Sequence, residues 1–211
     1  MEYTAVLVAA GSGTRMNLGY NKILYEIEPN VRVIDKSIHL FNQDKRCKEV
    51  IVVLSENDID IVLNNVTKTI GGTTRCESVY NGVKLVKTDY VVIHDGARPF
   101  LTYPCLNRLV DELEKEDACF LAISERDTLK TVEDGYVTGT IDRSKVWHAQ
   151  TPQAFKTKLI KECLEKAISD NAKVTDDVSC VELYSDTKVK VVEGDPNNIK
   201  LTVKEDLNIV K

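Results

Sequence analysis

The first 123 residues alternate between short apolar runs and stretches in which apolar residues recur three or four positions apart. The continuous runs are rich in Val and Ile, a pattern typical of strands that are covered on both faces. The amphipathic stretches indicate helices that bury one side. We therefore predict strands at 5–10, 49–54, 66–70, 90–94 and 118–123, and helices at 33–41, 59–63, 75–86 and after Thr102.

Strands that alternate with helices predict a three-layer α/β fold with a mostly parallel sheet. The pattern changes over residues 126–148. Two runs rich in Thr and Val, 128–132 and 136–141, flank Asp134-Gly135, which is a strong hairpin signal. An isolated hairpin with few large apolar residues is marginal in water. We therefore expect an arm at about 126–148 that reaches across to a second subunit.

The C-terminal part returns to the α/β pattern. It predicts a helix at 158–168, a second helix opened by residues 175–177 and a strand at 188–192. Thr202 and Glu205 have the spacing of a capping box for the last helix. The chain has 211 residues and no internal repeat, so we expect a single domain over 1–211.

Charge and cysteine content exclude several classes of protein. The net charge is −5, which argues against general nucleic-acid binding. The six cysteines form no Cys-x-x-Cys pair, so they are expected to be free thiols in a reducing cytoplasm. No stretch approaches the roughly 18 apolar residues of a membrane helix. The sequence therefore predicts a cytoplasmic protein that binds neither membrane nor nucleic acid.

A glycine turn follows the first predicted strand and is the first candidate site. Gly11-Ser12-Gly13 can turn backbone N–H groups toward an anion, and Arg15 and Lys22 add two cations. The loop is not a Walker A motif, and Met16 stands where a dinucleotide fingerprint has its third glycine. We interpret it as a triphosphate cradle. A tight turn with solvated cations is the plain structural alternative.

Two further motifs lie at predicted strand ends, where ligands of α/β proteins bind. Gly71-Gly72 precedes a predicted helix that carries Ser78. The glycine pair either forms a wall against which a flat base can lie or is an ordinary turn. Asp95 and Arg98 follow the strand at 90–94. Asp95 is well placed for Mg²⁺ and Arg98 for a phosphate, although the two side chains could simply pair with each other. His94 is expected to be structural.

The remaining candidates are weaker when each is taken alone. Arg143 lies beyond the second strand of the arm, from where it either reaches a neighbouring site or stays on the surface. Residues 150–153, Gln-Thr-Pro-Gln, are compatible with a rigid turn. Thr175-Asp176-Asp177 is explained as a helix cap. Lys200 offers a late cation without a diagnostic spacing.

Taken together, these motifs resemble one family, the 2-C-methyl-D-erythritol 4-phosphate cytidylyltransferases of the non-mevalonate isoprenoid pathway. The match runs in family order over nearly the whole chain. Its motifs are 9–16 with Lys22, 71–72 with Arg75 and Ser78-Val79, 94–99, 126–128, Arg143 with Trp147 and 150–155, 175–177, and 198–202.

The resemblance implies a Rossmann-like nucleotidyltransferase fold, a homodimer joined by swapped arms, and Mg²⁺-dependent transfer of CMP from CTP to 2-C-methyl-D-erythritol 4-phosphate. It implies catalytic roles for Arg15 and Lys22 at the α-phosphate, and for Lys200 and the partner arm's Arg143 at the second substrate. The implied nucleotide pocket consists of Ala9, Ala10, Gly11, Ser12, Gly13, Thr14, Gly72 and Ser78. Asp95 is implied at the metal, and Asp95, Arg98, Thr128 and Thr151 at the second substrate.

The chain also departs from the family pattern. Thr73 and Thr74 stand where acidic residues are common, and Asn21 precedes Lys22 where many members have proline. A related family that transfers CMP to ribitol 5-phosphate shares the glycine loop and Thr-Pro-Gln. It is the nearest alternative, and an NAD-binding oxidoreductase is the alternative from another class.

Overall fold

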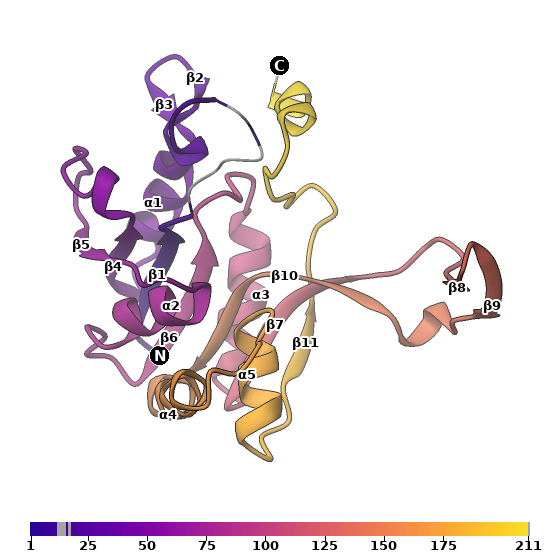
Figure 1. Ribbon diagram of the computed structural model, residues 1–211. Coiled ribbons are helices and arrows are strands. Elements are labelled where there is room, and N and C mark those ends of the chain that lie inside the picture. The colour runs from indigo at the N-terminus through magenta and orange to yellow at the C-terminus, as the bar shows by residue number, and fades with distance from the viewer. Residues whose placement is uncertain (12–15, 17, 211) are drawn as a thin grey trace.

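The computed structural model describes residues 1–11, 16 and 18–210. Over these residues, a seven-stranded sheet has the order β11-β7-β10-β6-β1-β4-β5 (Figure 1). Its strands are β1 Tyr3–Ala9, β4 Cys47–Leu54, β5 Thr67–Ile70, β6 Tyr90–Asp95, β7 Ala118–Ser124, β10 Trp147–Lys156 and β11 Lys190–Glu193. The neighbouring strands are parallel except β10, which runs antiparallel to both β6 and β7.

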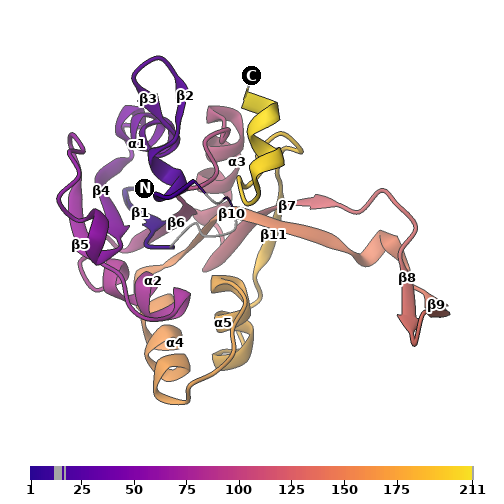
Figure 2. The ribbon, with the colours of Figure 1, turned by 45° about the horizontal axis from the view of Figure 1, so that its top comes forward.

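Helices cover both faces of the sheet (Figure 2). One hydrophobic core holds apolar side chains of α1 (Val33–Gln43) and α3 (Tyr103–Leu113) against the sheet. The other core holds side chains of α2 (Arg75–Val83), α4 (Thr157–Ser169) and α5 (Asp177–Tyr184). In β1, Leu7 faces the first core and Val6 the second, because successive side chains of a strand point to opposite faces. The predicted three-layer fold is confirmed.

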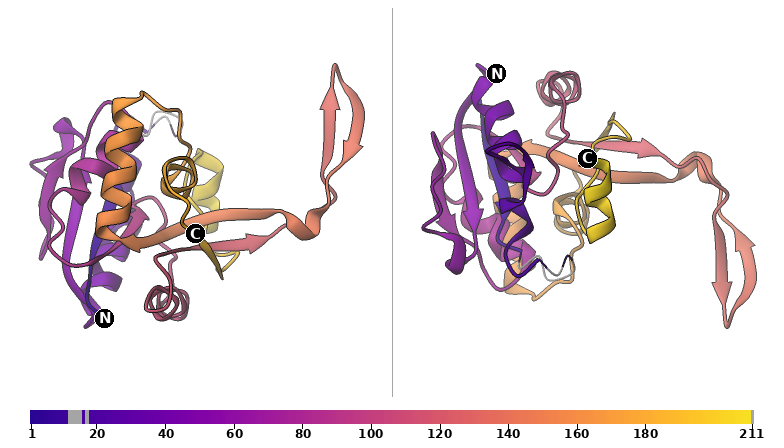
Figure 3. Two further views of the ribbon diagram at one scale, coloured as in Figure 1. Left: turned by 90° about the horizontal axis from the view of Figure 1, so that it is seen from below. Right: turned by 90° about the horizontal axis from the view of Figure 1, so that it is seen from above.

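An arm leaves the body between β7 and β10. It carries a small hairpin, β8 (Lys130–Glu133) and β9 (Tyr136–Thr140), that stands well away from the central sheet (Figure 3). Asp134 and Gly135 form the turn with φ of 50° and 85°, as the Asp-Gly signal predicts. Val132, Tyr136 and Val137 are 60%, 79% and 64% exposed. The arm therefore presents apolar surface that this chain itself does not cover.

Most predicted elements are confirmed to within a few residues, but the helix predicted at 59–63 is wrong. The chain instead makes a short 3₁₀ turn, η3 (Glu56–Asp58), and then a loop. The carbonyl oxygens of Ile59 and Ile61 accept hydrogen bonds from Lys68 Nζ at 2.5 and 3.1 Å. These carbonyls therefore bond to a neighbouring strand rather than within a helix.

The rigid turn considered for residues 150–153 is also wrong, because these residues lie within β10. Gln150, Thr151 and Gln153 are at most 5% exposed, and their side chains bond to Asp195, to His94 in β6 and to the start of α5. Buried polar residues hid the strand because they interrupt the apolar pattern.

At the C-terminus, η5 (Lys204–Val210) is a 3₁₀ helix, and the Thr202 and Val203 N–H groups donate to Asp206 instead of the predicted Glu205.

The two-stranded sheet of β2 (Glu26–Glu28) and β3 (Val31–Arg32) was not predicted. Its strands are too short for a periodic pattern to identify. No helix among the described residues is long and apolar enough to cross a membrane.

Candidate functional site

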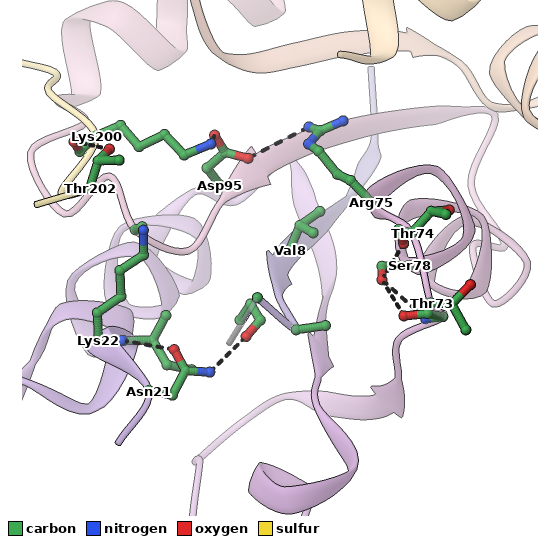
Figure 4. Close-up of a pocket in the computed structure, with 16 residues that line it drawn as sticks. Val8, Asn21, Lys22, Thr73, Thr74, Arg75, Ser78, Asp95, Lys200 and Thr202 are labelled. Carbon is green, nitrogen blue, oxygen red and sulfur yellow. Dashed lines mark hydrogen bonds and ion pairs between the residues drawn. The ribbon is translucent and has the colours of Figure 1, made fainter. Parts of the chain in front are cut away.

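A cavity of about 460 Å³ opens at the C-terminal ends of β1 and β6 and the turn after β5 (Figure 4). Ligands of α/β proteins bind at this edge of a sheet. The cavity is lined by Val8, Ala9, Ala10, Gly11, Asn21, Lys22, Ile23, Gly72, Thr73, Thr74, Arg75, Ser78, Asp95, Ala97, Lys200 and Thr202. The lining residues come from five separate parts of the chain, and they include the predicted nucleotide-side residues that the structure describes.

The glycine turn at 71–72 makes one wall of the cavity. A Cβ atom on Gly71 would lie 2.5 Å from Ala10 Cβ, and one on Gly72 would lie 2.3 Å from Glu77 Cβ. Ser78 Oγ accepts a hydrogen bond from the Gly72 N–H at 3.0 Å and donates to the Thr74 carbonyl at 2.9 Å. Glycine is therefore needed for close packing here, and the resulting wall consists largely of backbone.

The two threonines that replace acidic residues bond to Glu77 in a capping box at the start of α2. Glu77 Oε2 accepts from Thr73 N, Thr73 Oγ1 and Thr74 N at 2.7, 2.5 and 2.9 Å. The hydrogen bond from the Thr73 hydroxyl, with the others, lowers the pKa of Glu77. The carboxylate at this corner of the cavity is thus held by the helix N-terminus.

Asp95 is the negative centre of the cavity and is 7% exposed. Its carboxylate lies 2.7 Å from Lys200 Nζ, 3.6 Å from Arg75 Nη2 and 3.9 Å from Arg98 Nε. Burial raises the pKa of Asp95, but these three cations outweigh it and hold the pKa at about 2. Asp95 is therefore an ionised carboxylate inside a ring of positive charge.

Arg75 and Asp177 form an ion pair that the sequence interpretation missed. Arg75 Nη1 and Nη2 donate to the two oxygens of Asp177, both at 2.8 Å, and Asp177 is 1% exposed. Desolvation lowers the pKa of Arg75, but Asp177 and Asp95 outweigh it and raise the pKa. Asp177 lies in the first turn of α5, so the cap interpretation is correct but incomplete. The pair joins residues 102 positions apart, a separation for which spacing carries no signal.

His94 and Thr151 form a chain of hydrogen bonds that holds the Asp95 backbone in place behind the cavity wall. The His94 Nε2 atom lies 3.1 Å from the Arg98 carbonyl, which can only accept, so Nε2 carries the proton. Nδ1 then accepts from the Thr151 hydroxyl at 3.0 Å, and Thr151 Oγ1 accepts from the Asp95 N–H at 3.0 Å. His94 is fully buried and structural, as predicted. Thr151 is 4% exposed and lies behind the cavity wall instead of lining the cavity.

The buried imidazole predicts a pH dependence of stability. Desolvation lowers the pKa of His94 to about 4, whereas an unfolded histidine titrates near pH 6.5. Between these values the unfolded chain binds more protons, so the free energy of unfolding falls as the pH falls, by up to about 1.4 kcal/mol per pH unit. Urea unfolding from pH 7 to pH 5 measures this slope. His94→Gln should flatten it, and an unchanged slope in this variant would contradict the assignment.

Arg98 also supports the site from outside the cavity lining. Its Nη1 atom donates to the Asn198 carbonyl at 2.6 Å, which joins the Asp95 loop to the segment that carries Lys200. Its Nε atom is buried and has no hydrogen-bond partner among the described residues. The direct substrate contacts expected of Arg98 and Thr151 are therefore not favoured in this arrangement, in which both side chains hold the loop in place.

Other predicted residues are not brought to the cavity of the same chain. Thr128 and Arg143 are exposed on the arm, and Arg143 Nη1 donates to the Arg126 carbonyl at 2.6 Å. Ser12, Gly13, Thr14 and Arg15 lie outside the described residues. Arg75 and Asn21 are among the cavity residues that had no predicted role, since Arg75 was quoted only as part of a motif and Asn21 only as a departure from the family pattern.

Comparisons with known proteins identify the family of this chain. The family model for 2-C-methyl-D-erythritol 4-phosphate cytidylyltransferase matches residues 3–211. The enzyme of that name from Geobacillus kaustophilus is 40% identical over 219 residues, covering 98% of this chain and 94% of its own. The one from Shouchella clausii is 39% identical, with coverage of 98% and 94%. The crystal structure of 4-diphosphocytidyl-2C-methyl-D-erythritol synthase from Anaerococcus prevotii matches with a TM-score of 0.87 at 33% identity, covering 99% and 94%.

The fold and its site are those of a nucleotidyltransferase, with the cavity at the carboxyl edge of a mostly parallel sheet. The chain belongs to the 2-C-methyl-D-erythritol 4-phosphate cytidylyltransferase family. The resemblance deduced from the motifs is thereby confirmed, as is the class of enzyme, a cytidylyltransferase. The comparisons give no support to the dinucleotide-binding oxidoreductase that the glycine loop alone allowed.

Proposed function

We propose that this chain transfers CMP from CTP to 2-C-methyl-D-erythritol 4-phosphate at the cavity between β1, β6 and the 71–72 turn, a step of the non-mevalonate isoprenoid pathway. The products are 4-diphosphocytidyl-2-C-methyl-D-erythritol and pyrophosphate. The main support for this proposal is the arrangement of three charged side chains. Lys22, Asp95 and Lys200 face one cavity whose opposite wall is the glycine turn (Figure 4).

The nucleotide occupies the glycine-rich side. The backbone at Ala9, Ala10 and Gly72, with Ser78 behind it, offers a flat wall for cytidine. Lys22 extends from the turn η2 (Lys22–Leu24) into the cavity and stabilises charge at the α-phosphate. Gly11, Ser12, Gly13, Thr14 and Arg15 complete the phosphate cradle in the proposal.

Asp95 would hold Mg²⁺ together with the phosphates of the nucleotide. Mg²⁺ is commonly held by one or two carboxylates together with substrate phosphates. The described residues contain no group of three or more His, Cys, Asp or Glu side chains that would hold a metal by itself. Asp95 is a buried, ionised carboxylate on the cavity wall and fits a single protein ligand. When bound, the ion supplies positive charge to the phosphates.

The chemistry requires two anions to meet. An oxygen of the methylerythritol phosphate forms a bond to the α-phosphorus of CTP, and the bond from that phosphorus to the bridging oxygen breaks as pyrophosphate leaves. No covalent enzyme intermediate is needed, so the protein contributes position and electrostatic stabilisation. Lys22 acts on the nucleotide side and Lys200 on the nucleophile side of the cavity.

The second substrate's site is completed by a second copy of the chain. Arg143 and Thr128 lie on the arm, which extends away from the body of its own chain (Figures 1 and 3). The exposed Val132, Tyr136 and Val137 need a covering surface, and a hairpin of this size is marginal alone. A homodimer that exchanges arms meets both needs.

The described cysteines are all free, which supports a reducing, cytoplasmic location.

An assay of pyrophosphate release tests the proposed reaction. Purified enzyme with CTP and Mg²⁺ is expected to release pyrophosphate with 2-C-methyl-D-erythritol 4-phosphate and to form the diphosphocytidyl product, which mass spectrometry identifies. Ribitol 5-phosphate serves as the competing acceptor. Release with ribitol 5-phosphate alone would favour the related family, and release with neither acceptor would overturn the proposal.

A further inference from the structure

Asn21 is a buried asparagine directly before Lys22, and its side-chain amide is fully engaged. It is 6% exposed. Its Oδ1 atom accepts from the Ile23 N–H at 3.3 Å. Its Nδ2 atom donates to the Ala9 carbonyl at 3.1 Å and to Asp58 Oδ2 at 2.8 Å. One side chain thus bonds to the end of β1, to the turn that carries Lys22 and to η3.

The segment that carries Lys22 is anchored by Asn21 and by the neighbouring Ile23, which is 2% exposed in the hydrophobic core. The turn η2 contains only three residues, and a 3₁₀ turn of that length has poor hydrogen-bond geometry and fixes little by itself. Asn21 is the N-cap of this turn, so it fixes the position from which the Lys22 side chain extends. Its anchor Asp58 is held in turn by Ser55 Oγ, which donates to the same Oδ2 atom at 2.6 Å.

We propose that Asn21 is a positioning residue for the transfer reaction, because its amide fixes the Lys22 turn against the end of β1 so that Lys22 meets the reacting phosphate. This inference rests on the proposed function, in which Lys22 stabilises the transition state. The Ala9 carbonyl is a suitable anchor for positioning Lys22. Ala9 forms part of the nucleotide wall, so the bond from Asn21 to Ala9 sets the lysine relative to that wall.

The backbone conformation of Asn21 shows what the three hydrogen bonds of its side chain stabilise. Its φ is −65° and its ψ is 127°, values that a proline ring adopts without strain. Among the described residues the Asn21 N–H makes no backbone hydrogen bond that a proline would remove. Asn21 therefore holds by three hydrogen bonds a conformation that a proline ring would hold covalently.

A double-mutant cycle with Lys22 tests the role. Asn21→Ala is expected to lower kcat by about 10–10²-fold, since displacing a catalytic group by about 1 Å costs on that order. In the Lys22→Ala background the same change should have no further effect on kcat, because no lysine remains to be positioned. The KM for CTP should change less than kcat, since the lost interaction belongs to the transition state.

Asn21→Pro and a remote asparagine provide the controls. Asn21→Pro should recover most of the kcat lost in Asn21→Ala. Asn107 also bonds through its side chain, to Arg46 Nη2 at 2.5 Å, but lies near the N-terminal edge of the sheet, so Asn107→Ala should leave kcat unchanged. Thermal unfolding shows that each variant is folded at the assay temperature.

Three results would overturn the positioning role. They are an unchanged kcat in Asn21→Ala, an equal loss in both backgrounds, and a proline variant as poor as the alanine variant. Failure of the proposed function has a different signature. In that case Lys22→Ala itself would keep near-normal turnover, whereas a failed positioning role would leave the Lys22→Ala loss intact and Asn21→Ala silent.

Discussion

Replacing Lys22 by alanine is expected to lower kcat for CMP transfer by about 10²–10³-fold, the usual cost of removing one donor that stabilises charge in a transition state. Lys22 lines the same cavity as Asp95 and Lys200. As the phosphate monoester approaches, negative charge gathers around the α-phosphorus, and a cation positioned in advance needs no reorganisation at that moment. Steady-state pyrophosphate release with both substrates saturating measures the effect.

A remote lysine separates this effect from a change in net charge. Lys115 lies just beyond α3 with its side chain 67% exposed, and among the described residues its ammonium group pairs only with Glu112, at 3.3 Å. Lys115→Ala removes the same charge and should keep kcat near the wild-type value. Near-normal turnover in Lys22→Ala would show that the glycine-loop side of the cavity does not stabilise the transition state.

Replacing Arg143 by alanine is expected to lower kcat/KM for the methylerythritol phosphate by about 10²-fold, because the nucleophile loses a positioning cation. Lys145 lies in the same short turn and is 83% exposed, which makes Lys145→Ala a matched control with little expected effect. The loss in Arg143→Ala should appear with the second substrate, while CTP binding measured by calorimetry stays close to that of the wild type.

Mixed dimers locate the cavity that Arg143 serves. In a dimer of one Lys22→Ala chain and one Arg143→Ala chain, arm exchange leaves one cavity with both side chains intact. Random mixing during co-expression should therefore recover about a quarter of wild-type activity from two nearly inactive variants, as two-fold symmetry dictates. If each arm served its own cavity, every cavity in the mixture would lack one cation and the activity would stay at the level of the single variants.

Much of the fold follows from local patterns. The apolar run before Gly11 predicted β1, and the runs ending at Leu54 and His94 predicted β4 and β6. The Asp134-Gly135 turn was predictable because a two-residue hairpin loop selects residues that tolerate positive φ. In each case the decisive forces act between residues a few positions apart, so the sequence carries the signal directly.

The candidate site was predictable only where residue type alone suggested chemistry. Gly11, Gly72, Lys22 and Asp95 were named from their motifs and Lys200 from the family resemblance, and the structure places these residues at one cavity. The supporting roles were not predictable. Thr151 and Arg98 were expected to contact substrate, yet their side chains bond to His94 and to the Asn198 backbone. Such roles depend on burial, which a motif does not report.

The sequence by itself determined most of the elements, the family and the residue types of the site, since these rest on periodicity and on short motifs. Only the tertiary structure decided that β10 lies between β6 and β7, that Arg75 pairs with Asp177, and that Asn21 joins Ala9 to Asp58. The physical reason is common to all three. Each contact satisfies buried polar or charged groups across long separations, and which partner satisfies a buried group is settled by packing rather than by spacing along the chain.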